Sequence, residues 1–176
     1  MLSNCLIEMH RRSASDDDGW EAAERALKLD PNLAEAHAAR GAVLCVRGLY
    51  DEGLVACKRA LDLDPDSYEA NKHAGRCCLA TRRFADAIRY FEQAAAVMPS
   101  DFYALGMTLQ ANEALGDRAG EQNAARRTLE RVEKIIAQEP DHGRAIGFGV
   151  YALTSLRERE RAKEWTPEHT ARITGL

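Results

Sequence analysis

Three prolines at a constant spacing constrain this chain of 176 residues more than any other feature. Pro31, Pro65 and Pro99 follow one another at intervals of 34 residues. The seven residues that end at Pro65 differ from the seven that end at Pro31 at one position. Because proline cannot continue a helix, each of the three indicates where a helix has ended. A fixed period of this length is typical of stacked helix pairs.

The composition agrees with a helical chain and excludes two classes of function. The sequence has 30 Ala and 18 Leu but only 6 Val and 6 Ile, which favours helix over sheet. A net charge of −4 argues against a nucleic-acid binder. No apolar run has the length of a membrane helix, so we expect no membrane partner. The five cysteines are odd in number and form no Cys-x-x-Cys, which predicts a reduced, cytoplasmic protein.

Around the prolines, small residues recur at the same interval. Gly41 and Gly75 are 34 residues apart, as are Ala60 and Ala94. The first clear unit reads His37-x2-Arg40-Gly41-x2-Leu44, Gly53-x3-Cys57, Ala60, Pro65, and the second reads Asn71-x2-Ala74-Gly75-x2-Cys78, Ala87-x3-Phe91, Ala94, Pro99. This pattern resembles the tetratricopeptide-repeat family. The resemblance implies an all-α fold, a right-handed α-solenoid of about four antiparallel helix hairpins with degenerate ends.

The period also sets the expected boundaries. Pro140 follows Pro99 by 41 residues, and the seven extra residues equal about two helical turns. We expect a degenerate unit over 1–33, repeats over 34–67 and 68–101, a repeat with a lengthened second helix over 102–142, and a truncated unit over 143–176. First helices are expected over 34–47, 68–81, 102–115 and 143–156, and second helices over 17–29, 51–63, 84–97, 118–138 and 158–165. A further helix is expected over 2–12, a polar turn over 13–18, and a terminal helix over 167–174.

No pattern in the sequence indicates catalysis, a cofactor or a metal. His73 and Cys77 lie four residues apart on an expected helix, but no further ligand is evident, so we interpret them as structural. Cys57 and Cys78 stand where the family usually has aromatic residues, and we expect them in the core. We therefore predict that the chain is not an enzyme and that it holds no cofactor.

The candidate site is a surface. In the resembled family, the first helices line a concave groove. Mapped onto this chain, the candidate partner-binding residues on that face are Lys72, His73, Arg76, Tyr103, Met107, Arg144, Phe148 and Tyr151. They predict a protein or peptide partner with acidic and apolar side chains. An alternative for Met107 and Phe148 is that they pack between helices and are not accessible.

Two functions follow from these patterns. The first is a non-catalytic scaffold that binds a protein or peptide. The second is a regulatory or oligomerising tail of a multidomain signalling protein, because the lengthened third unit is loosely similar to the repeats that follow the catalytic domain in some bacterial adenylyl cyclases. The degenerate ends would also allow self-association, for instance as a homodimer.

Overall fold

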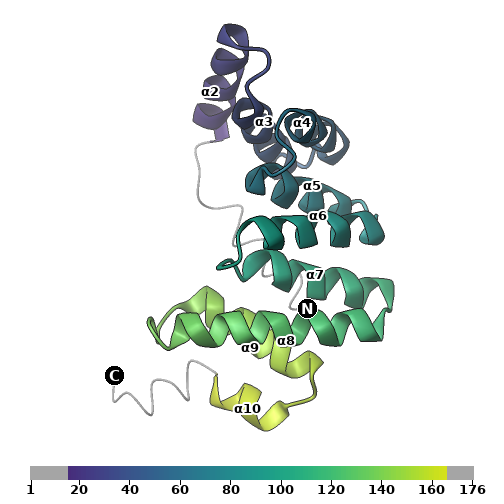
Figure 1. Cartoon of the computed structure of the whole chain (residues 1–176), viewed down its shortest axis with the longest axis vertical. Coiled ribbons are helices and arrows are strands. Elements are labelled where there is room, and N and C mark those ends of the chain that lie inside the picture. Colours follow the sequence, from purple (N-terminus) through teal and green to yellow (C-terminus); the bar gives the residue numbers. More distant parts are fainter. Residues whose placement is uncertain (1–15, 166–176) are drawn as a thin grey trace. The chain divides into compact units, whose positions relative to one another are not determined.

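The computed structural model describes residues 16–165, and every regular element among them is a helix (Figure 1). The predicted all-α fold of consecutive helix hairpins is confirmed. The chain divides into two compact units, the first ending at Val97 and the second beginning at Met98. The helices expected over 2–12 and 167–174 lie outside the described residues. No helix within 16–165 is both long enough and apolar enough to cross a membrane.

The first unit contains five of the described helices. They are α2 (Asp16–Leu29), α3 (Ala34–Val46), α4 (Tyr50–Leu63), α5 (Tyr68–Ala80) and α6 (Phe84–Val97). Helices α3 and α4 form one hairpin, and α5 and α6 form the next (Figure 1). One local expectation was wrong: Asp16–Asp18 belong to α2 and not to a turn. Acidic residues suit the first turn of a helix, where the backbone dipole favours negative charge.

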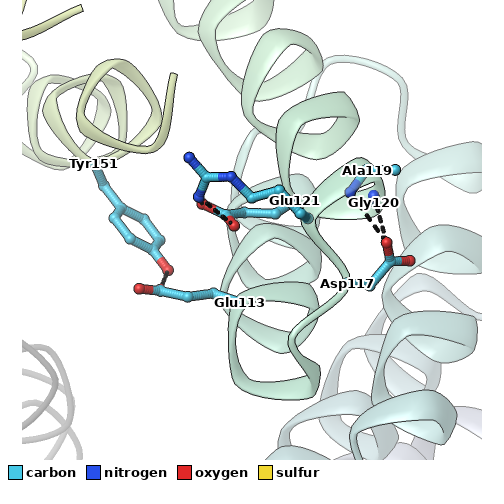
Figure 2. A network of polar contacts seen from close by, with 7 residues as sticks. Glu113, Asp117, Ala119, Gly120, Glu121 and Tyr151 are labelled. Atoms are coloured by element: carbon cyan, nitrogen blue, oxygen red, sulfur yellow. Dashed lines mark hydrogen bonds and ion pairs between the residues drawn. The ribbon is translucent and has the colours of Figure 1, made fainter. Parts of the chain in front are cut away.

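The second unit contains two hairpins. They consist of α7 (Tyr103–Leu115) with α8 (Arg118–Ile136), and α9 (Gly143–Ser155) with α10 (Arg159–Glu164). Helix α8 has 19 residues, whereas α4 and α6 have 14 each. The predicted lengthening of this helix is therefore present. At its start, the Asp117 carboxylate accepts hydrogen bonds from the backbone N–H groups of Ala119 and Gly120 (Figure 2).

The turn inside each hairpin repeats one backbone conformation. Gly48, Arg82, Gly116 and Arg157 all have a positive φ, between 61° and 80°. Their spacings are 34, 34 and 41 residues, the same as those of the prolines. After each of them the next N–H bonds back to a carbonyl five residues earlier, as from Leu49 to Leu44 at 2.9 Å. The repeat is thus present in backbone geometry as well as in sequence.

Polar side chains join successive hairpins of the first unit at the same interval. His37 Nε2 lies 2.9 Å from the Pro31 carbonyl, and Asn71 Nδ2 donates to the Pro65 carbonyl at 3.2 Å. His37 and Asn71 occupy the family's tryptophan position. Here that position is used to hold the proline turn of the preceding helix.

The core is built from small side chains, which let the helices approach closely. In the first unit, Ala60 is fully buried and packs with Ala38 and Ala70 on the two neighbouring first helices. A β-carbon on Gly41 would lie 2.4 Å from Cys57 Sγ. The second unit has two apolar clusters, one around Leu109, Leu129 and Leu153 and the other around Phe102, Val132 and Phe148.

Candidate binding surface

The eight candidate residues fall into two groups, three on α5 in the first unit and five on α7 and α9 in the second. On α5, Lys72, His73 and Arg76 lie on one side of the helix because they are spaced by one, three and four residues. His73 is buried, whereas Lys72 and Arg76 are half-buried. Only one of the three is without an acidic partner, as the contacts of Glu69 show.

Glu69 binds two of the three cationic positions. Its carboxylate lies 2.6 Å from Lys72 Nζ and 3.3 Å from His73 Nε2. The hydrogen bond with His73, followed by the contacts with Lys72, lowers the pKa of Glu69 to about 2. The Lys72 ammonium also lies over the Tyr68 ring, 4.9 Å from its centroid. These side chains are therefore already engaged within α5.

Arg76 differs from its neighbours. Across the part of the chain that the structure describes, its guanidinium has no hydrogen-bond or ion-pair partner. One turn earlier, His73 Nδ1 is buried and likewise has no hydrogen-bond partner. A free cation beside an unsatisfied ring nitrogen is the least satisfied polar group on this face, and it could accept an anionic group from a partner.

In the second unit, the aromatic members of the set support one another. Phe148 on α9 is 6% exposed and its ring lies edge-to-face with Tyr103 on α7, the centroids 5.9 Å apart. Arg144 is exposed and lies over the Tyr103 ring at 5.6 Å. Met107 is half-buried beside them. Phe148 and Tyr103 thus form the base of this face, and Arg144 and Met107 are its accessible members.

Tyr151 has a partner of its own. Its hydroxyl donates to the carboxylate of Glu113, which joins α9 to α7 (Figure 2). Burial, followed by this hydrogen bond, raises the pKa of Tyr151. Nearby, Arg118 Nη1 donates to both oxygens of Glu121 at 2.8 Å. The sequence treated Tyr151 as a contact residue and did not anticipate Glu113, which lies 38 positions away.

Two surface hollows lie away from the candidate residues. The larger, of about 550 Å³, is lined by α8 and the segment before α7, with Arg127, Arg131 and Lys134 among its residues. Arg131 is held there by the Asp101 carbonyl at 3.1 Å, and Lys134 by Glu130 at 2.8 Å. A smaller hollow, of about 340 Å³, lies between Asp66 and Gln93 in the first unit.

Ligands for a metal do not gather in the described part of the chain. Within residues 16–165, no three side chains of the His, Cys, Asp and Glu types are placed to hold an ion. Cys57 and Cys78 are buried, as expected, together with Cys45 and Cys77. All four are free thiols.

Comparison with known proteins identifies the repeat. The family model described as tetratricopeptide repeat matches residues 44–112. The resemblance to that family is therefore confirmed. A search of curated proteins gave no match.

Solved structures share the fold at low sequence identity. The crystal structure of MamA superposes with a TM-score of 0.62 at 22% identity, covering 82% of this chain and 81% of that one. MamA from residue 41 to its end, from Desulfovibrio magneticus RS-1, gives 0.64 at 16% identity, with coverages of 93% and 89%. The NMR structure of the first TPR domain of human RPAP3 gives 0.57 at 21%, with coverages of 74% and 98%.

Proposed function

We propose that this tetratricopeptide-repeat fold is a non-catalytic scaffold, which binds a protein or peptide through the exposed faces of its first helices. The observation that carries the proposal is Arg76, a half-buried cation that lacks a carboxylate partner among residues 16–165. A cation in such a position gains more from an external anion than a fully solvated one does. The partner supplies the anion.

The first unit sets the charge of the partner. Because Glu69 already binds Lys72 and His73, these two contribute little net positive charge to the face. Arg76 is then the anchor, and an Asp or Glu side chain of the partner pairs with it. Glu35 and Glu69 are exposed on α3 and α5, and they repel an acidic segment from their own edge. The position of the acid within the bound segment follows from this contrast.

The second unit adds apolar contact area and a second cation. Met107 is half-buried on α7, and a flexible thioether adapts to side chains of different shape. Arg144 is exposed over the Tyr103 ring, where its guanidinium plane is held by the aromatic face. Such an arginine offers both a charge and a flat apolar surface. The partner therefore carries apolar as well as acidic residues.

The alternative function, a tail of a cyclase-type signalling protein, stays a prediction, as does self-association. Neither has a contact within the described residues that favours it over the scaffold. The absence of a cofactor also stays a prediction.

Selection from a peptide display library tests the proposal even while the natural partner is unidentified. The purified chain is the bait, and a chain with Arg76→Glu and Arg144→Glu is the comparison. We expect the wild-type chain to enrich peptides that combine Asp or Glu with apolar residues, and the variant to enrich different ones. Enrichment of basic peptides, or of the same peptides by both chains, would refute the proposed surface.

A further inference from the structure

Four buried thiols meet where α3, α4 and α5 cross in the first unit, and the proposed scaffold function does not use them. Two glycines make room for the sulfur atoms. A β-carbon on Gly41 would lie 2.4 Å from Cys57 Sγ, and one on Gly53 would lie 3.1 Å from Cys77 Sγ. The same point over Gly53 is 3.3 Å from the backbone nitrogen of Cys45. Cys45 and Cys77, on successive first helices, therefore approach each other across α4.

The surroundings of the two thiols are unequal. The thiol of Cys77 hydrogen-bonds to the sulfur of Cys45 and lowers the pKa of Cys45, and the nearby His73 and Arg76 act in the same direction. Burial opposes them. The same hydrogen bond, together with burial, raises the pKa of Cys77. Cys45 is thus the member of the pair that becomes the thiolate, and Cys77 is the member that keeps its proton.

His73 marks this cluster as incompletely satisfied. It lies one turn before Cys77 on α5, its side chain is nine-tenths buried, and its Nδ1 has no hydrogen-bond partner. Arg76, which contributes to the pKa shift of Cys45, has no carboxylate partner among the described residues. A negative charge on Cys45 would be stabilised by both groups.

We propose that Cys45 and Cys77 form an oxidisable thiol pair, in which Cys45 attacks a hydroperoxide and Cys77 closes an intramolecular disulfide. Cys45 is the more accessible of the two, with 4% exposure against 0% for Cys77. The other two thiols are poorer nucleophiles, because burial raises the pKa of Cys57 to about 12 and also raises that of Cys78. Hydrogen peroxide is small and neutral, so a brief opening of the helix packing admits it.

The chemistry balances in two steps. The Cys45 thiolate attacks one peroxide oxygen, an S–O bond forms, the O–O bond breaks, and the departing oxygen takes a proton to leave as water or an alcohol. The sulfur of Cys77 then attacks the sulfenic sulfur of Cys45, an S–S bond forms, and the hydroxyl leaves as water with the thiol proton of Cys77. Two thiols lose two electrons and two protons, and one peroxide is reduced.

The disulfide would join the first helices of successive hairpins, α3 and α5. Helix α5 also carries Arg76 and His73, so oxidation would fix the position of the proposed binding face relative to α3. A low-molecular-weight thiol would reverse the reaction by thiol–disulfide exchange.

The test is oxidation of the folded full-length chain with hydrogen peroxide, followed by intact mass and peptide mapping. We expect the loss of two hydrogen atoms and a cross-linked peptide pair containing Cys45 and Cys77. Cys57→Ser keeps this product, whereas Cys45→Ser abolishes it and leaves Cys77 a thiol. The same reaction in urea is the control, and it gives a mixture of pairings.

A second variant keeps the test independent of folding defects. Arg76→Met retains every thiol, and it should slow oxidation of Cys45 severalfold at neutral pH but not at a pH where the thiol is fully ionised. Circular dichroism checks that each variant is folded. A wild-type chain that forms no Cys45–Cys77 disulfide, or an Arg76→Met rate equal to that of wild type at neutral pH, would overturn the proposal.

Discussion

The ring of Phe148 on α9 lies directly against the backbone of Gly106 on α7. A β-carbon on Gly106 would come within 2.1 Å of the ring, too close for any side chain. Gly75 and Phe91 stand in the same relation inside the α5–α6 hairpin, where the shortest such distance is 2.7 Å. Paired glycine and aromatic residues therefore set the helix spacing at both places.

Replacement of this glycine should destabilise the second unit. Gly106→Ala forces the Phe148 ring to move within a packed cluster, and we expect the free energy of unfolding to fall by about 1–3 kcal/mol. Gly147→Ala on α9 is the matched control, because a β-carbon there meets no atom within 4 Å. Since alanine favours helix, Gly147→Ala should stabilise by roughly 0.5–1 kcal/mol. Urea unfolding followed by circular dichroism measures both, and equal effects of the two changes would contradict the packing described.

The hairpin turns offer a prediction of opposite sign. Arg82 has a φ of 61°, in the left-handed region that disfavours every residue with a β-carbon. Arg82→Gly should raise the free energy of unfolding by about 0.5–1 kcal/mol. At the equivalent position Gly48 has a φ of 80°, so Gly48→Ala should lower stability. Thermal unfolding of both variants checks the pair, and a loss of stability in Arg82→Gly would count against the turn geometry.

The sequence predicted the helices well, because the proline period and the small residues act locally and recur. It placed α6 at 84–97, as the structure has it. It did not predict how charges are shared on the candidate face. The spacing of Glu69 from Lys72 and His73, by three and four residues, could have shown that Glu69 binds both. The contact of Tyr151 with Glu113 depends on how α9 packs on α7, which no local pattern encodes.

Stability should depend on the ionisation of Glu69. Its pKa is lowered from 4.5 to about 2, so its contribution is present above pH 4.5 and is lost as the pH falls towards 2. Because the side chain is 56% exposed, we expect less than about 1 kcal/mol. Wild type and Glu69→Gln should differ in urea midpoint at neutral pH and converge near pH 2. A difference that persists at pH 2 would assign the effect to something other than this carboxylate.

The Tyr151 hydroxyl should contribute to the stability of the second unit. Tyr151→Phe removes its hydrogen bond to Glu113 and should cost about 0.5–1.5 kcal/mol. Glu113→Gln keeps an acceptor oxygen and should cost less. Chemical denaturation of both variants, with the double variant to measure their coupling, checks this contact. Additive effects in the double variant would show that the two side chains do not interact.

The central claim is that Arg76 anchors an acidic partner, and binding affinity tests it most directly. The measurement is the Kd of an acidic, apolar peptide selected by the wild-type chain, compared between Arg76→Glu and Lys58→Glu. Lys58 is exposed on α4, a second helix, so its reversal changes the net charge equally but not the proposed face. We predict that Arg76→Glu weakens binding at least about fivefold, equivalent to about 1 kcal/mol, and that Lys58→Glu leaves it nearly unchanged. Equal losses in the two folded variants, or no loss in Arg76→Glu, would contradict the account.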